Sequence, residues 1–149
     1  MKRAAFRVLC CLWLLVLCLI SPLRAAEPGE IMMTGQEIRA AAELTTSEEA
    51  ATTFALSNDV TAVILYVDFT TGSLTSATFT PTGNLDSTET TAAYKIVGYS
   101  KTFETEGRYV WRVPREEFGS YVAGMVCVGT GTPAGSSAAV RYRLERRRP

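Results

Sequence analysis

Hydrophobic and polar residues alternate in short runs through most of the chain beyond residue 59. In VTAVILYVDFT (residues 60–70), one face of the run is formed by Val63, Leu65, Val67 and Phe69. GRYVWRVP (residues 107–114) and AAVRYRLE (residues 138–145) repeat this period of two, with apolar faces formed by Tyr109, Trp111, Val113, Val140, Tyr142 and Leu144. A period of two is typical of a β-strand that buries one face. We therefore expect these apolar residues, Trp111 included, to form a core.

Further segments complete the set of strands. SLTSATFTPTG (residues 73–83) and YKIVGYSKTF (residues 94–103) are predicted strands, the second one bent at Gly98. YVAGMVCV (residues 121–128) is apolar on both faces, which predicts a central strand covered on each side. REEFGS (residues 115–120) is a connection with room for one helical turn. Short strands separated by Gly, Thr, Asn and Pro predict an all-β fold, an antiparallel β-sandwich of the jelly-roll or immunoglobulin-like type.

The segment over residues 34–44 fits either a helix or a strand. Thr34 and Glu37 have the spacing of a capping box, which would open a short helix ending at Leu44. Apolar residues in the same stretch also alternate as in a strand, at Ile38, Ala40, Ala42 and Leu44. We expect a strand over residues 39–45 and a second one over residues 52–56.

The first residues have the pattern of a secretory signal peptide. The basic start MKRAAFR is followed by an apolar run over residues 8–20, then by Pro22 and by small residues at Ala25 and Ala26. The apolar run is shorter than the roughly 18 residues that predict a membrane span. We expect cleavage after Ala25, contact with a membrane only during export, and a secreted location, periplasmic or extracellular. An uncleaved anchor is the alternative.

These patterns divide the chain into four parts. Residues 1–25 are the predicted signal peptide, and residues 26–58 are a lead-in with one or two short strands. Residues 59–145 are the predicted sandwich core, and residues 146–149 are a basic tail. The length after cleavage is enough for one domain with a core of its own.

Removal of the leader changes the charge and the cysteine content. Residues 26–149 hold eleven basic and fifteen acidic residues, a net charge of −4. This negative charge does not predict nucleic-acid binding, because domains that bind nucleic acids usually carry an excess of basic residues. Cys10, Cys11 and Cys18 leave with the leader, and Cys127 cannot form an intrachain disulfide alone.

The glycine-rich segment CVGTGTPAGSS (residues 127–137) does not have the spacing of a nucleotide-binding loop. A dinucleotide fingerprint needs G-x-G-x-x-G before a helix, whereas Gly129, Gly131 and Gly135 precede an alternating strand. A Walker loop needs a lysine after its last glycine, where this chain has Ser136. We expect a hairpin-like connection whose glycines allow positive φ.

The sequence offers little catalytic chemistry. It contains no histidine, the commonest general base and zinc ligand. Cys127 lies in an apolar run, where burial raises the pKa of a thiol; an intermolecular disulfide is the alternative. NLDSTE (residues 84–89) has oxygen ligands at alternate positions but lacks the glycine and distant glutamate of a calcium-binding EF-hand loop. We predict no enzyme activity, no cofactor and no metal.

Two groups of residues are candidates for surface binding. Among the aromatic residues in or beside predicted strands, Tyr66 and Tyr99 have the best claim to exposure, where they would stack on sugar rings. Arg146, Arg147 and Arg148 form the basic tail. We interpret the tail as a solvated charge run; the alternative is attraction to an anionic surface, which salt would weaken.

Residues 60–144 resemble a class of small β-sandwich domains found in bacteriophage and prophage structural proteins. The resemblance rests on AVILYVDFTTGSLTSATFTPTG, then EGRYVWRVP, then YVAGMVCVGTGTPAGSSAAVRYRL. It implies a virion or appendage component that works by packing and self-association, without catalytic residues. The signal peptide departs from that family, because virion proteins assemble in the cytoplasm.

The sequence therefore predicts a secreted, non-catalytic β-sandwich that acts as a structural or adhesive subunit through self-association. Ile64, Tyr66, Val122, Val126 and Val128 support this, because they are apolar residues on the second faces of their strands. We expect a homo-oligomer or an appendage or surface partner. A carbohydrate-binding, lectin-like module with a polysaccharide ligand is the alternative.

Overall fold

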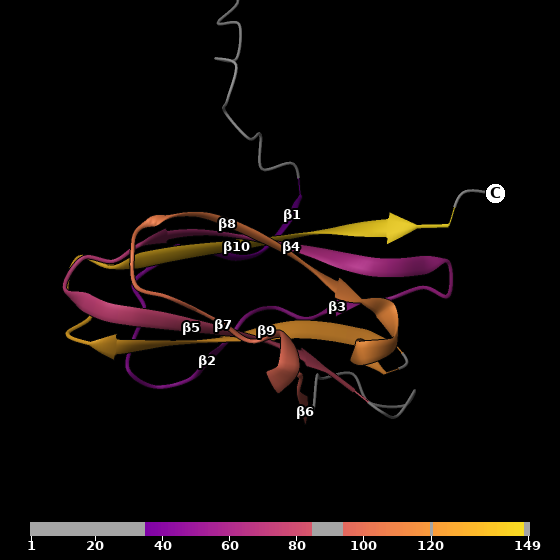
Figure 1. The fold of residues 1–149 in the computed structure, drawn as a ribbon, viewed down its shortest axis with the longest axis horizontal. Helices are drawn as coiled ribbons and strands as arrows, with labels where there is room; N and C mark the ends of the chain where they lie inside the picture. Colours follow the sequence, from indigo (N-terminus) through magenta and orange to yellow (C-terminus); the bar gives the residue numbers. More distant parts are fainter. Residues whose placement is uncertain (1–34, 85–93, 120, 148–149) are drawn as a thin grey trace, which may run out of the picture. The chain divides into compact units, whose positions relative to one another are not determined.

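The computed structural model describes residues 35–84, 94–119 and 121–147. They belong to one compact unit, Met33–Pro149, in which two β-sheets pack face to face (Figure 1). Sheet A has the strand order β1-β10-β4-β8, and sheet B has the order β2-β9-β5-β6, with β3 also beside β9 and β7 beside β5. All of these strand pairs are antiparallel, as predicted for an all-β sandwich.

The strands have the following bounds. Sheet A consists of β1 (Gln36–Ala42), β4 (Val60–Thr70), β8 (Gly107–Pro114) and β10 (Ser137–Arg146). Sheet B consists of β2 (Glu49–Ala50), β3 (Phe54–Ala55), β5 (Leu74–Gly83), β6 (Tyr94–Lys95), β7 (Lys101–Phe103) and β9 (Val122–Gly131). Within the described ranges, no helix is long and apolar enough to cross a membrane.

The core lies between the two sheets and uses the alternating residues of the central strands. Sheet A contributes Val63, Leu65, Val67 and Phe69 of β4, all of them buried. Sheet B contributes Ala77 and Phe79 of β5 and Met125 and Cys127 of β9. The rings of Phe69 and Phe79 meet edge to face across the two layers, with 6.0 Å between their centroids. The predicted inward face of β8 is confirmed: Val113 is fully buried, and Tyr109 and Trp111 pack against the core.

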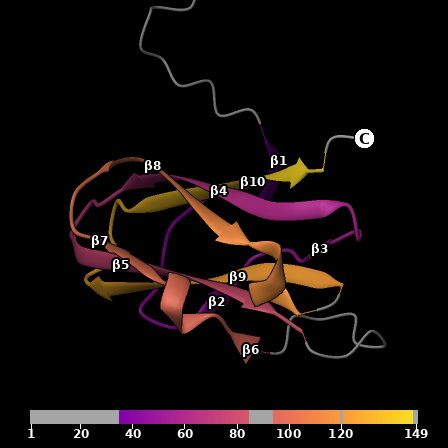
Figure 2. The same ribbon diagram turned by 45° about the vertical axis from the view of Figure 1, so that its right-hand side comes forward.

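Most connections between consecutive strands cross from one sheet to the other (Figure 2). The glycine-rich segment is one of these, because it joins β9 of sheet B to β10 of sheet A. The expected hairpin-like geometry is therefore wrong, although Gly131 and Gly135 do have positive φ. This connection packs against the one between β4 and β5: the Ser73 amide donates a hydrogen bond of 3.0 Å to the Ala134 carbonyl. The glycines thus shape a crossover between the layers.

The ambiguous segment over residues 34–44 contains a strand. β1 begins at Gln36 and ends at Ala42, earlier at both ends than the predicted strand over residues 39–45. The predicted strand over residues 52–56 is shorter, and only Phe54 and Ala55 of β3 pair with β9. Ile38, Leu44, Phe54 and Leu56 are buried in the core. This lead-in therefore supplies edge strands to both sheets.

The predicted strand over residues 94–103 is two strands separated by a turn. A 3-10 helix, η1 (Val97–Tyr99), lies between β6 and β7. The break faces Pro81 of β5, whose carbonyl accepts a hydrogen bond of 2.8 Å from the Ile96 amide. Carbonyl and amide of one strand residue point to the same side, and proline has no amide hydrogen to donate there. The hydrogen-bond ladder between β5 and the segment of residues 94–103 therefore lacks a backbone donor at Pro81. The helical turn predicted within residues 115–120 is confirmed as η2 (Arg115–Phe118).

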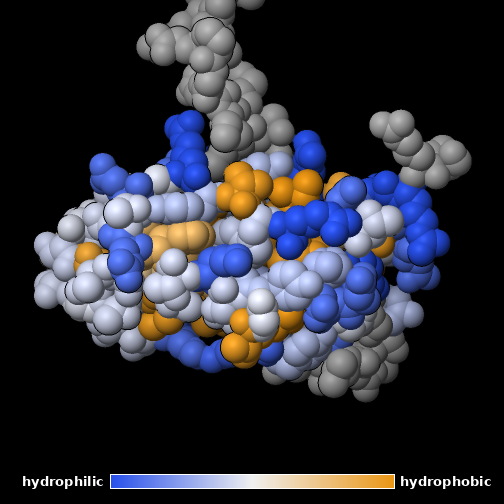
Figure 3. Space-filling view, viewed as in Figure 1, coloured by the Kyte–Doolittle hydropathy of each residue, from blue (hydrophilic) through white to orange (hydrophobic). Residues whose placement is uncertain are grey.

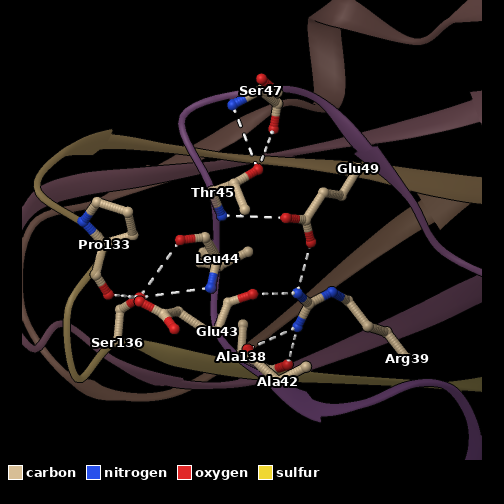
Figure 4. Close-up of polar contacts among 10 residues, drawn as sticks. All are labelled: Arg39, Ala42, Glu43, Leu44, Thr45, Ser47, Glu49, Pro133, Ser136 and Ala138. Atoms are coloured by element: carbon tan, nitrogen blue, oxygen red, sulfur yellow. Dashed lines mark hydrogen bonds and ion pairs between the residues drawn. The ribbon is translucent and has the colours of Figure 1, made fainter.

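Arg39 joins β1 to the opposite sheet through a group of polar contacts (Figure 4). Its guanidinium donates to the carbonyls of Ala42, Glu43 and Ala138, and it pairs with the carboxylate of Glu49 at 2.7 Å. The other oxygen of Glu49 accepts a hydrogen bond of 3.1 Å from the Thr45 amide. The Arg39 side chain is only 10% exposed. A buried cation with this many acceptors is satisfied by the fold and is not offered to a ligand.

Candidate interaction surfaces

The outward side of sheet A combines an apolar stripe with arginines. We call this surface the sheet A face; its central positions are Ala62, Ile64, Tyr66, Asp68, Arg108, Val110, Arg112, Ala139, Arg141, Arg143 and Glu145. The stripe runs along β4, where Ala62, Ile64 and Tyr66 are absent from the core cluster. Strands β8 and β10 contribute the arginines on both sides of it. The predicted apolar second face of β4 is therefore present.

Tyr66 lies on the sheet A face but is not exposed. Its side chain was expected at the surface, and this expectation is wrong, because the residue is only 7% exposed. Strand register places Tyr66 directly beside Val110 of β8 and Arg141 of β10. Long side chains on adjacent strands cover the ring of a central strand, because cross-strand neighbours lie only about 5 Å apart. Tyr66 therefore offers little of its ring to a sugar.

Ion pairs cross the sheet A face. Arg112 of β8 pairs with Glu145 of β10 at 2.8 Å, although β4 lies between these two strands. The pair passes over the region of Ala62 and Ile64, which lie opposite Glu145 and Arg112 in the strand register. Arg108 pairs with Asp68, and Arg141 pairs with Glu37, both at 3.5 Å. A partner docking here would have to displace or desolvate these charges.

The outward side of sheet B has a different composition. We call it the sheet B face; its central positions are Ala50, Ser76, Thr78, Thr80, Ser100, Thr102, Val126, Val128 and Thr130. None of these side chains is charged, and Ser100 belongs to the group through its contact with Thr80. An ion pair between Lys95 of β6 and Glu48, which precedes β2, joins the two edges of the sheet across β9 and β5. The prediction that β9 is covered on each side is wrong within the described part of the chain: Val126 and Val128 are half-buried on the outward side. The apolar second face of β9 therefore reaches the surface.

Aromatic side chains close the open side of the sandwich between β7 and β8. The rings of Phe103 and Tyr109 stack with 3.6 Å between their centroids, and Trp111 meets Phe103 edge to face at 5.9 Å. Figure 3 shows this side, where hydrophobic surface lies between the layers and hydrophilic side chains interrupt it. Tyr99, the second predicted sugar-stacking residue, is half-buried and packs against the core. The aromatic residues here stabilise the sandwich edge.

The basic tail does not form a uniform positive surface. Arg146 pairs with Asp59 at 2.8 Å. The hydrogen bond from the Ser57 hydroxyl and this ion pair hold the pKa of Asp59 below its ordinary value. Arg147 lines a surface pocket of about 320 Å³ together with Asn58, Val60, Thr61, Arg115 and Glu116. Arg148 lies outside the described residues. The tail is thus partly paired with acidic groups of its own chain.

The surroundings of Cys127 suppress the reactivity of its thiol. Cys127 is fully buried, and burial raises the pKa of its thiol to about 12. Such a thiol is a poor nucleophile at neutral pH. Across the described ranges, no three His, Cys, Asp or Glu side chains are grouped so that they could hold a metal ion. Of the NLDSTE segment only Asn84 is described, and its side-chain oxygen accepts a hydrogen bond of 3.1 Å from the Val122 amide.

Sequence reasoning missed the most exposed apolar residues and the row of hydroxyl side chains on the sheet B face. Val97, Val110 and Tyr121 are the large hydrophobic residues with the greatest exposure in the described part of the chain. The sheet B face had a signal in the sequence, since Thr78 and Thr80 alternate with buried residues, as do Val126 and Val128. The alternation in each strand did not show that the two strands share a face, because this depends on the register between β5 and β9.

The chain matches no family model, and comparison with curated proteins and with solved structures found no significant similarity.

Proposed function

We propose that this chain is a secreted, non-catalytic β-sandwich of jelly-roll topology that acts as a structural or adhesive subunit by self-association. The observation that carries the proposal is the presence of apolar side chains on the solvent sides of both sheets. Ile64 and Val110 lie on the sheet A face, and Val126 and Val128 lie on the sheet B face. Apolar surface on both outer faces is costly for an isolated domain, and a partner that covers it recovers the hydrophobic free energy.

The topology supports the proposal. The strand order is β1-β10-β4-β8 in one sheet and β2/β3-β9-β5-β6/β7 in the other, and most connections cross between the two sheets. This order is the one expected for the double Greek key of a jelly roll. An immunoglobulin-like sandwich would place different strands beside one another. Jelly rolls are common in capsid and lectin domains, so the topology fits both a structural subunit and a sugar-binding module. The resemblance of residues 60–144 to phage structural domains favours the first.

Secretion is supported by the leader pattern at residues 1–25. The non-catalytic part of the proposal is supported by a chain without histidine and by the buried thiol of Cys127. The lectin-like alternative loses support, because Tyr66 is buried and Tyr99 packs against the core. No row of exposed aromatic rings remains among the described residues to stack on a sugar.

The experiment is a measurement of molar mass by light scattering on the protein collected after export of the full chain. We expect a mass above that of one chain, rising with protein concentration at micromolar levels. A monomer at every concentration would contradict the proposal. Retention of that monomer on a polysaccharide column would support the carbohydrate-binding alternative instead.

A further inference from the structure

We infer that the surface pocket beside the end of β10 binds a small ligand that carries one carboxylate group. We call it the Arg147 pocket; it has a volume of about 320 Å³ and is lined by Asn58, Val60, Thr61, Arg115, Glu116 and Arg147. Ligand pockets have volumes of roughly 300–1,000 Å³, so this one suits a molecule as small as a monosaccharide or an amino acid. The inference goes beyond the proposed function and does not depend on self-association.

Three segments that are far apart in the sequence form the pocket. They are the start of β4 with the turn before it, the start of η2, and the residue that follows β10. The Arg147 amide donates a hydrogen bond of 2.9 Å to the Asp59 carbonyl, which holds the end of β10 against this turn. Pro114 pairs with Ala62 in the sheet, so η2, which begins at the next residue, lies beside the start of β4. The fold therefore fixes all three walls of the pocket.

The charges of the pocket favour an anion. Two of its side chains are guanidinium groups, those of Arg115 and Arg147, and one is a carboxylate, that of Glu116. Two positive charges minus one negative charge leave a net charge of +1. Arg146 and Asp59 lie next to the pocket in sequence, but they pair with each other at 2.8 Å and leave this balance unchanged.

The two guanidinium groups differ in what they already bind. Arg147 is exposed, and its side chain makes no hydrogen bond or ion pair within the described part of the chain. Arg115 is half-buried and donates to the Gly119 carbonyl, which fixes the direction of its side chain. A guanidinium presents its N–H donors in a planar fork that matches the two oxygens of a carboxylate. Arg147 therefore provides the main contact, and Arg115 provides a fixed positive charge on the same pocket.

Glu116 restricts the ligand further. Its carboxylate repels a ligand with two negative charges, so a single carboxylate is favoured over a phosphate dianion. The same carboxylate accepts a hydrogen bond from a hydroxyl or an ammonium group. The ligand is thus a carboxylic acid with a donor group close to its carboxylate. Uronic acids and amino acids share this chemistry, and the experiment separates them.

The test is an NMR titration, at constant ionic strength, of the protein collected after export of the full chain. The probes are glucuronate and alanine, each compared with a match that lacks the carboxylate, glucose or alaninamide. The amide signals of Thr61, Glu116 and Arg147 report on the pocket. We expect saturable shifts of these signals with at least one acid and none with either match. No shifts with both acids, or equal shifts with the matches, would overturn the inference.

Arg147→Gln removes the guanidinium that provides the main contact. Arg143→Gln is the matched control, because it removes an exposed arginine of β10 that does not line the pocket. We expect Arg147→Gln to weaken binding about tenfold or more, as for the loss of a hydrogen bond between charged groups, and Arg143→Gln to leave it unchanged. Circular dichroism and thermal unfolding check that both variants fold. Equal weakening by the two variants would indicate an effect of overall charge and would overturn the site.

Glu116→Gln separates the two classes of ligand. Alanine should bind this variant more weakly than the wild type, because its ammonium group loses an opposite charge. Glucuronate should bind it more tightly, because the glutamine oxygen still accepts from a hydroxyl while the repulsion is removed. A variant that binds each acid as the wild type does would overturn the role of Glu116.

Inorganic phosphate is the last probe. Tighter binding of phosphate than of either acid by the wild type would overturn the choice of a carboxylate. None of these outcomes changes the molar mass measured by light scattering, so failure of this inference and failure of the proposed function are seen separately.

Discussion

The carboxylate of Glu49 lies 2.7 Å from the guanidinium of Arg39 and joins a strand of sheet B to a strand of sheet A. The same guanidinium donates to the carbonyls of Ala42, Glu43 and Ala138, so one side chain anchors β1, the segment after it, and β10 (Figure 4). The hydrogen bonds from Arg39 and Thr45 are the main causes that hold the pKa of Glu49 below its ordinary value of 4.5. The contribution of this ion pair to holding the two sheets together therefore depends on pH.

Glu49→Gln should lower the free energy of unfolding at pH 7 by about 1–2 kcal/mol, because hydrogen bonds to an ionised group are lost while the shape is kept. The carboxyl of Glu49 has a lowered pKa in the folded chain. Its contribution is therefore complete well above pH 4.5 and is lost as the pH falls through the folded value. Denaturant unfolding at a series of pH values should show the difference between wild type and variant shrinking in acid.

Glu48→Gln is the matched control for this prediction. Glu48 is adjacent in sequence, but its ion pair with Lys95 is largely exposed. An exposed pair contributes only about 0–1 kcal/mol, so this variant should unfold nearly as the wild type does. Equal effects of the two substitutions, or a Glu49→Gln difference that does not vary with pH, would contradict the role assigned to Glu49.

Gly119→Ala should destabilise the protein by about 2–4 kcal/mol, because it combines a left-handed backbone with a steric overlap. Gly119 has φ of +69°, and a Cβ atom there would overlap the carbonyl oxygen of Asn84. The measurement is the midpoint of urea unfolding. Gly98→Ala is the control, because a Cβ at Gly98 meets nothing within 4 Å. If the Gly119→Ala and Gly98→Ala proteins were equally stable, the close approach between Gly119 and the Asn84 carbonyl would be contradicted.

Cys127 should not react with a thiol reagent in the native protein at pH 8, because burial raises the pKa of its thiol to about 12. Labelling should become complete in denaturant. The measurement is the extent of modification by mass spectrometry, with and without guanidinium, and Cys127→Ser serves as the blank. Rapid labelling of the native protein would contradict the burial, and a mixed disulfide between chains would support the alternative stated for this cysteine.

The exported protein should begin at Ala26. Intact mass would then correspond to residues 26–149, and the unfolded protein would contain one reactive thiol. A protein that retains the leader would contain four thiols, since Cys10, Cys11 and Cys18 would remain. Finding four thiols after export would favour the uncleaved anchor. This measurement is independent of the fold and of the surfaces.

The inner faces of the long strands could be predicted because alternation along one strand is local information. Val63, Leu65, Val67 and Phe69 had to share a face, whatever the partner of β4 was. The break between β6 and β7 was not predictable from residues 94–103 alone. It depends on Pro81, which lies on another strand and faces Ile96 only after the sheet has formed.

The candidate surfaces were only partly predictable for the same reason. An apolar second face was visible in Ile64 and Tyr66 and in Val126 and Val128. The burial of Tyr66 was not visible, because Val110 and Arg141, which lie beside it, come from distant parts of the chain. The row of hydroxyl side chains on the sheet B face likewise arises from the pairing of β5 with β7 and β9.

The order of residues along the chain was thus sufficient to establish an all-β domain, its inward side chains and its lack of histidine chemistry. These follow from composition and from a period of two, which any strand obeys. The folded chain was required to decide the strand neighbours, the crossing of the glycine-rich connection between layers, and the side chains that share each outer face. They depend on register between segments far apart in sequence, and packing free energy, rather than local pattern, selects that register.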